Sequence, residues 1–121
     1  TFTSSSDYRL KKDEVAISNA LSTVKALKPY QFTWKSDGKL GQGFFAHEAQ
    51  AVLPDVGVVS GTKDEVHTND DTENGGQYKK DDPIYQGIDY SKLVPLLTAA
   101  LQEETAKREA LEARVAALEG S

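Results

Sequence analysis

Residues 90–118 read YSKLVPLLTAALQEETAKREALEARVAAL, and this stretch decides how the chain is built. Nine positions in it follow alternating steps of four and three residues, and seven of the nine are apolar: Tyr90, Val94, Leu97, Leu101, Leu111, Val115 and Leu118. The pattern lasts for roughly four heptads, which is typical of a coiled coil rather than of a helix on a globular core. We therefore predict that residues 90–119 form a helix that pairs with copies of itself.

The two other positions of this predicted seam hold Glu104 and Arg108. Opposite charges at adjacent core positions can pair between chains and fix their register, although burying them costs stability. Asp89 is suited to cap the helix, and Pro95 is tolerated in its first turns. These residues predict an oligomer and leave the number of strands open.

Upstream of the helix, the pattern predicts a small helix-strand head over residues 6–89, so that the fold class is α+β. A helix is expected from Asp13 to Lys28, because apolar residues form one stripe there and Pro29 ends it. Residues 30–34 alternate aromatic and polar side chains, which predicts a half-buried strand. Shorter elements are expected at 36–38 (a turn), 44–46 (a strand or turn), 47–52 (a helix ended by Leu53-Pro54), 56–59 and 84–88 (strands).

Residues 60–83 have a different composition, with seven Asp and Glu against three Lys. One interpretation is a mobile, solvated loop, because long polar loops are commonly disordered. The other is an arm that grips a partner. Val66 and Tyr78 flank an Asn-Gly-Gly turn at 74–76, which is compatible with a loose hairpin.

The composition excludes several classes of function. The 121 residues contain no cysteine, so disulfides and thiolate chemistry are absent. A net charge of −5 argues against a nucleic-acid partner, and no apolar run approaches the ~20 residues that span a bilayer. No glycine-rich phosphate motif indicates a cofactor. Methionine is absent even at position 1, so we expect a piece of a longer protein.

The candidate chemistry lies near the start of the chain, where Ser6 precedes Lys11 by five residues. A serine hydroxyl becomes a nucleophile when a base removes its proton, and a neutral lysine amine can be that base. Five residues place two side chains about 140° apart on a helix and on opposite faces of a strand. The segment between them must therefore turn if they are to meet. On composition alone, a polar linker is the commoner interpretation.

A second candidate is His47-Glu48-Ala49-Gln50-Ala51, which invites comparison with the zinc motif that has two histidines. Ala51 stands where the second histidine would be, so no metal site is expected. His47 is either a proton shuttle or a hydrogen-bonding core residue. His67 lies in the polar segment and is expected to be solvated.

Four blocks in order resemble one known family. They are residues 6–11 (SDYRLK), 28–35 (KPYQFTWK), 43–50 (GFFAHEAQ) with Leu53-Pro54, and 88–97 (IDYSKLVPLL) with 100–103 (ALQE). The chain resembles the C-terminal intramolecular chaperone, auto-processing domain of phage tailspikes, tail fibres and endosialidases (peptidase family S74). The resemblance covers nearly the whole chain from Ser6 onward.

This resemblance implies a homotrimer, with a head at 6–89, a polar arm at 60–83 and a trimeric coiled-coil helix at 90–119. Residues 1–5 would be the end of an upstream stalk or linker. The domain would template the folding of that fibre stalk, which belongs to the same polypeptide, and then cut itself off in a single turnover. The precursor would be made in the host cytoplasm, and the chaperone would be released before the virion matures.

The resemblance also assigns residues. Ser6 would be the nucleophile, Lys11 the general base and Ser5–Ser6 the cut bond, with accessory roles open for Asp7, Arg9, His47 and Glu48. A cut before Thr1 is an alternative. The main rival function is a non-catalytic trimerisation and attachment module retained on the fibre. A serine-lysine protease acting on other proteins is a weaker rival, because no substrate cleft is apparent from the sequence.

Overall fold

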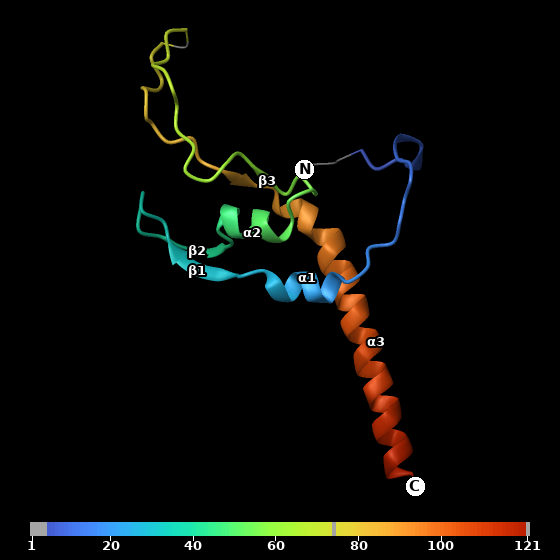
Figure 1. The fold of residues 1–121 in the computed structure, drawn as a ribbon. Helices are drawn as coiled ribbons and strands as arrows, with labels where there is room; N and C mark the ends of the chain where they lie inside the picture. The colour runs from blue at the N-terminus through green and yellow to red at the C-terminus, as the bar shows by residue number, and fades with distance from the viewer. Residues whose placement is uncertain (1–4, 74, 121) are drawn as a thin grey trace.

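The computed structural model describes residues 5–73 and 75–120, and it has the α+β fold class that the sequence predicts (Figure 1). The predicted stalk residues 1–4, and a cut before Thr1, lie outside these residues. Two small antiparallel sheets and two short helices lie beside the upper part of a long C-terminal helix. In chain order the elements are η1 (Tyr8–Leu10), α1 (Ala20–Ala26), β1 (Tyr30–Thr33), β2 (Leu40–Gly43), α2 (Ala46–Val52), β3 (Val59–Ser60), β4 (Gly87–Ile88), η2 (Tyr90–Leu93) and α3 (Val94–Glu119).

A small core forms where α1 and α2 meet the start of α3. Leu93 at the end of η2 and Leu96 and Ala100 of α3 form one side of it; they follow one another at helical spacing and are all buried. The side chains that complete the core are Ala20, Leu27, Ala49 and Val58. The first turns of the long helix therefore belong to the head, which the heptad pattern alone did not predict.

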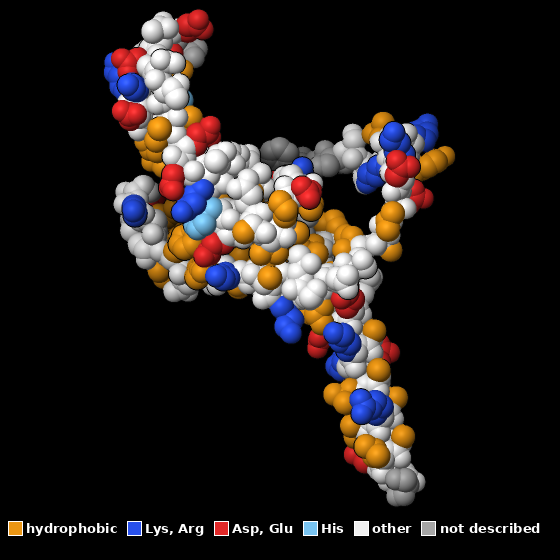
Figure 2. Space-filling view, in the orientation of Figure 1, with side chains coloured by type: hydrophobic (Ala, Val, Ile, Leu, Met, Phe, Trp, Pro, Cys, Tyr) orange, Lys and Arg blue, Asp and Glu red, His pale blue; other side chains and the backbone are white. Residues whose placement is uncertain are grey.

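A different face of α3 carries the predicted seam, and that face is exposed. Leu101 is 68% exposed, Leu111 57% and Val115 43%, although all three are apolar. Figure 2 shows hydrophobic side chains along the exposed length of α3, interspersed with charged ones. Because the chain's own core uses the adjacent face, the seam is left available for another chain.

Tyr90 begins the heptad pattern but packs against the head. Its hydroxyl accepts a hydrogen bond from the Phe44 backbone N–H at 3.2 Å, and its ring stacks on the Phe44 ring. The same hydroxyl lies so close to Gly43 that a Cβ at that position would collide with it. Glycine at position 43 therefore permits the contact between the hairpin and the base of α3.

The first helix is shorter than predicted, since α1 begins at Ala20 and not at Asp13. Asp13 and Asn19 both adopt left-handed backbone, with φ of 57° and 56°, and the chain between them is not helical. The N–H groups of Ala20 and Leu21 donate to the carboxylate of Glu103 on α3, at 2.8 and 3.0 Å. A tertiary contact from 83 residues away therefore sets the start of α1.

The predicted strand is confirmed at Tyr30–Thr33 and pairs with β2 in register Tyr30 to Gly43, but it is exposed rather than half-buried, with Phe32 alone partly covered among its four residues. The second strand lies at Leu40–Gly43 and not at 44–46, where Phe44 and Phe45 form the approach to α2 and Ala46 begins it. The predicted turn is present, with Gly38 in left-handed backbone at φ 72°. Gly41 lies under the Phe32 ring, where a side chain would collide. Glycine at position 41 of β2 therefore leaves room for the aromatic ring of β1.

Residues 60–83 form a long arm that leaves the head above β3 and β4 (Figure 1). The two sides of the arm are joined by an antiparallel bridge between Val66 and Pro83 and by hydrogen bonds between His67 and the residues opposite it. His67 also stacks on Tyr78, with ring centroids 3.6 Å apart. The loose hairpin is therefore present, whereas the predicted strand at 84–88 is reduced to Gly87–Ile88.

Candidate active site

Ser6 and Lys11 are brought together by a tight turn. The chain is extended at Asp7, makes one 3₁₀ turn through Tyr8–Leu10 and is extended again at Lys11. Two backbone hydrogen bonds close the turn, from the N–H of Leu10 to the Asp7 carbonyl and from the N–H of Lys11 to the Tyr8 carbonyl. Lys11 Nζ then donates to Ser6 Oγ at 2.7 Å. The five-residue separation is thus bridged by the kind of turn that it requires.

Asp7 and Arg9 hold this turn from its outer side. Asp7 Oδ1 accepts from the backbone N–H of Arg9 at 2.9 Å and from its Nε at 3.0 Å, and Oδ2 accepts from Nη2 at 2.8 Å. These contacts lower the pKa of Asp7, because the hydrogen bonds from the Arg9 side chain and backbone stabilise its charged form. They also raise the pKa of Arg9. The positive charge of Arg9 is therefore compensated by Asp7.

The site is open to solvent on this chain. Residues 5–12 are all exposed, and this range includes Ser5, which precedes the expected nucleophile. A serine hydroxyl in contact with an amine has the parts of a base-assisted nucleophile. The carbonyl of Ser5 is covalently adjacent to Ser6, so the geometry suits a reaction of the chain on itself.

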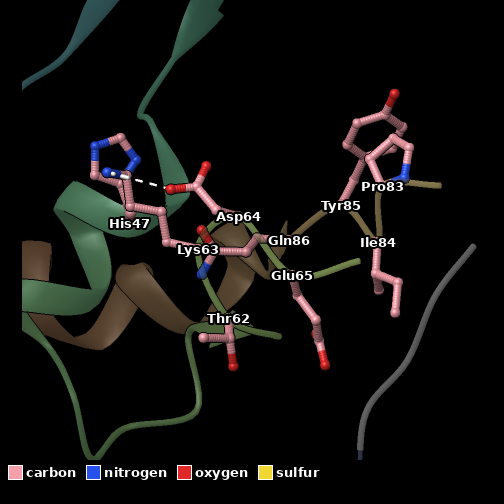
Figure 3. A pocket seen from close by; sticks show the side chains of 9 residues that line it. All are labelled: His47, Thr62, Lys63, Asp64, Glu65, Pro83, Ile84, Tyr85 and Gln86. Carbon is pink, nitrogen blue, oxygen red and sulfur yellow. Dashed lines mark ion pairs between the residues drawn. The ribbon is translucent and has the colours of Figure 1, made fainter. Parts of the chain in front are cut away.

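His47 lies apart from this turn, in the first turn of α2. It is exposed, and its ring stacks on Phe45 with centroids 6.2 Å apart. It borders a hollow of about 300 Å³ at the base of the arm, where Lys63 pairs with Asp64 at 3.6 Å. Figure 3 shows His47 and the other side chains that line this hollow. The hollow is lined by His47, Thr62, Lys63, Asp64, Glu65, Pro83, Ile84, Tyr85 and Gln86. Because the ring is exposed, His47 is not a buried core residue, whereas an accessory role beside Ser6 stays a prediction.

Glu48 is the neighbour of His47 on α2 and points toward the β1 end of the head. Its Oε2 lies 4.0 Å from Lys28 Nζ. The pKa of Tyr30 is raised, first by the hydrogen bond between its phenol and the Glu48 carboxylate. Partial loss of water around the phenol and the negative charge of Glu48 raise it further. Glu48 therefore ties α2 to the entrance of β1, which is a structural role.

The structure does not join the two groups of candidates. Across the described ranges, no hydrogen bond or ion pair connects Ser6 or Lys11 with His47 or Glu48. Glu103 stabilises the fold by accepting hydrogen bonds at the start of α1, a role that the sequence did not indicate. It lies in one of the motif blocks, but nothing in its spacing indicates that it caps a helix 83 residues away.

Neither a metal centre nor a membrane span is found within the described parts of the chain. No group of three or more His, Cys, Asp or Glu in residues 5–73 and 75–120 is placed to hold a metal ion. Within the same ranges, no helix has the length and apolar character that crossing a bilayer requires.

Comparison with known families and structures supports the resemblance read from the sequence. Residues 6–58 match the model of a peptidase family described as chaperone of endosialidase, and this segment contains Ser6, Lys11, His47 and Glu48. This match supports, over residues 6–58, the family that the sequence motifs suggested. No curated protein matches the chain closely.

A solved structure shares the fold. It is described as the crystal structure of a novel intramolecular chaperone, and it superposes with a TM-score of 0.60 at 20% sequence identity. The match covers 84% of this chain and 99% of the other. At this level of identity the likeness establishes the fold alone.

Proposed function

Because residues 6–58 match the model of the chaperone-of-endosialidase family, we propose that this chain is an intramolecular chaperone that also cleaves itself. It trimerises at the end of a phage fibre or tailspike and templates the folding of the stalk that precedes it. It then releases itself by cutting the Ser5–Ser6 bond. The precursor is made in the host cytoplasm, and the chaperone leaves before the virion matures.

The observation that carries the catalytic part is the 2.7 Å hydrogen bond from Lys11 Nζ to Ser6 Oγ. Lysine acts as a base when its amine is neutral, and exclusion of water favours that form. Residues 5–12 are exposed on the isolated chain, so in this proposal the covering surface comes from the stalk or from neighbouring chains.

The proposed reaction has two steps. In the first step, the amine of Lys11 takes the proton of Ser6 Oγ, and this oxygen attacks the Ser5 carbonyl carbon. The peptide bond between Ser5 and Ser6 breaks, and the Ser6 nitrogen receives the proton from Lys11. The stalk is then held by an ester to Ser6 Oγ. Water attacks this ester with Lys11 as base, which frees a carboxylate on Ser5 and returns the hydroxyl to Ser6.

The exposed seam of α3 supports the trimer. Its apolar side chains gain burial only against other chains, because the head packs on the adjacent face of the helix. Joining three chains at one end raises their local concentration and sets their register. Intertwined stalks have many long-range contacts and fold slowly, so such a clamp has a clear benefit.

The arm at 60–83 supports a contact with the stalk. It is acidic, extends away from the head and is ordered mainly by its own hydrogen bonds, among them those of Asp70, Asp71 and Asp82. Asp71 is buried within it and accepts from the N–H groups of Glu73 and Gln77. An arm built in this way can reach a partner without disturbing the core.

The test of the chaperone role compares three proteins: the upstream stalk alone, the stalk joined to this chain, and the joined protein with Ser6→Ala. We expect the stalk alone to aggregate and the joined protein to give a detergent-resistant trimer. The Ser6→Ala protein should form the same trimer but stay covalently intact. A stalk that trimerises equally well alone would refute the chaperone role. If all joined proteins trimerise and none is cut, the chain is a retained attachment module.

A further inference from the structure

The turn that carries the Ser6–Lys11 contact has little support other than its own side chains. It is a single 3₁₀ turn of three residues, none of which is buried, and its backbone is closed by two hydrogen bonds. Short 3₁₀ segments have poor hydrogen-bond geometry, and isolated turns are marginal in water. Something else must therefore hold Lys11 next to Ser6.

The carboxylate of Asp7 makes the three further hydrogen bonds that close this turn. Asp7 precedes the turn in extended backbone, and its side chain folds over the turn to accept from the Arg9 N–H, Nε and Nη2. The first of these bonds is a helix-type cap, and the other two form a bidentate, charge-assisted pair. We refer to these three bonds as the Asp7–Arg9 clasp.

The position of the clasp in the sequence gives it a consequence for chemistry. Asp7 directly follows the nucleophile, and Arg9 is two residues before the base. Fixing Asp7 to Arg9 therefore fixes the backbone directions from which the Ser6 and Lys11 side chains leave. We propose that Asp7 is a positioning residue for self-cleavage, acting through Arg9 to hold Lys11 Nζ on Ser6 Oγ. This inference rests on the proposed self-cleavage and adds a residue to it.

The expected effects follow from what each substitution leaves behind. Asp7→Ala removes all three bonds, and loss of alignment between reacting groups can cost on the order of 10²-fold in rate. Asp7→Asn keeps an oxygen for the cap but loses the charge of the pair, so a loss of at most about 5-fold is expected. Arg9→Lys keeps the charge but not the planar fork, and it should fall between the wild type and Arg9→Ala.

The experiment measures the rate of single-turnover cleavage in the full precursor, with the upstream stalk present. The variants are Asp7→Ala, Asp7→Asn, Arg9→Ala, Arg9→Lys and the double variant Asp7→Ala/Arg9→Ala. If Asp7 acts through Arg9, the double variant cleaves no more slowly than Asp7→Ala, because the two residues form one clasp. Glu14→Ala is the matched control, since it removes an exposed carboxylate from the same segment but outside the turn.

Two readouts separate a positioning role from general damage. The melting temperature and the trimeric state should be unchanged in every variant, because the turn contributes nothing to the core. The second readout is the cleavage rate of Asp7→Asn, which should lie between the rates of Asp7→Ala and the wild type. If the wild type is cut and Asp7→Ala is cut as fast as Glu14→Ala, the inference is overturned and the proposed function stands. A wild type that is not cut at Ser6 would instead overturn the proposed function.

Discussion

Truncation of one seam leucine, Leu101→Ala, tests whether the exposed face of α3 is an interface between copies. Leu101 is 68% exposed on the single chain, so its loss should cost the monomer little. In a coiled-coil core, each leucine that becomes alanine costs ~2 to ~3 kcal/mol. One substitution changes three side chains in a trimer, which gives about 6 to 9 kcal/mol per trimer.

At ~1.4 kcal/mol for each tenfold change, this loss raises the trimer dissociation constant by roughly 10⁴ to 10⁶. The concentration at which half of the chains are trimeric varies as the square root of that constant. The midpoint should therefore rise about 10² to 10³-fold. Sedimentation equilibrium over a range of loading concentrations measures the midpoint directly.

The matched control is Gln102→Ala, which changes the next residue along α3, exposed but off the seam. It should sediment as the wild type does. The reasoning would be refuted by a wild type that is monomeric at micromolar concentration, or by Leu101→Ala and Gln102→Ala with the same midpoint.

Two further predictions concern the head. Hydrogen bonds from the N–H groups of Leu21 and Ala20 lower the pKa of Glu103, so its stabilising contribution is present above its ordinary pKa of 4.5 and lost as pH falls through the lowered value. The melting temperature of Glu103→Gln should therefore depend less on pH between 6 and 3 than that of the wild type, and parallel curves would contradict the cap. Gly43→Ala places a Cβ against the Tyr90 hydroxyl and should cost about 1 to 3 kcal/mol in urea unfolding. Adding Tyr90→Phe should recover part of this loss, and no recovery would mean that the strain lies elsewhere.

The sequence predicts the parts of the fold that depend on local pattern. The strand at Tyr30–Thr33, the turn before Gly38 and the long helix follow from alternation, turn residues and heptad spacing. The start of α1 does not follow from them, because Glu103 of α3 supplies its cap and the residues before Asn19 leave the helical region. The apolar stripe that continues back to Ile17 is therefore misleading, since Ile17 lies outside the helix and is 48% exposed.

The candidate site is only partly visible in the sequence. A serine five residues before a lysine implies a turn if the two meet, and Asp7 is a residue type that caps such turns. The Asp7–Arg9 clasp has no spacing signature of its own, because residues two apart do not face each other in a regular helix. For His47 the sequence left a proton shuttle and a core residue open; the structure places it exposed beside Phe45, so the core interpretation is wrong and the chemical role stays a prediction.

The central claim is that this chain cuts itself between Ser5 and Ser6, and one measurement tests it most directly. The precursor with its upstream stalk is expressed as wild type, Ser6→Ala and Lys11→Ala, and the intact masses of the products are determined after denaturation. We predict two fragments for the wild type, the C-terminal one beginning at Ser6, and a single uncut chain for both variants. A wild type that stays uncut, or one that is cut in the same way when Ser6 is alanine, would contradict the claim.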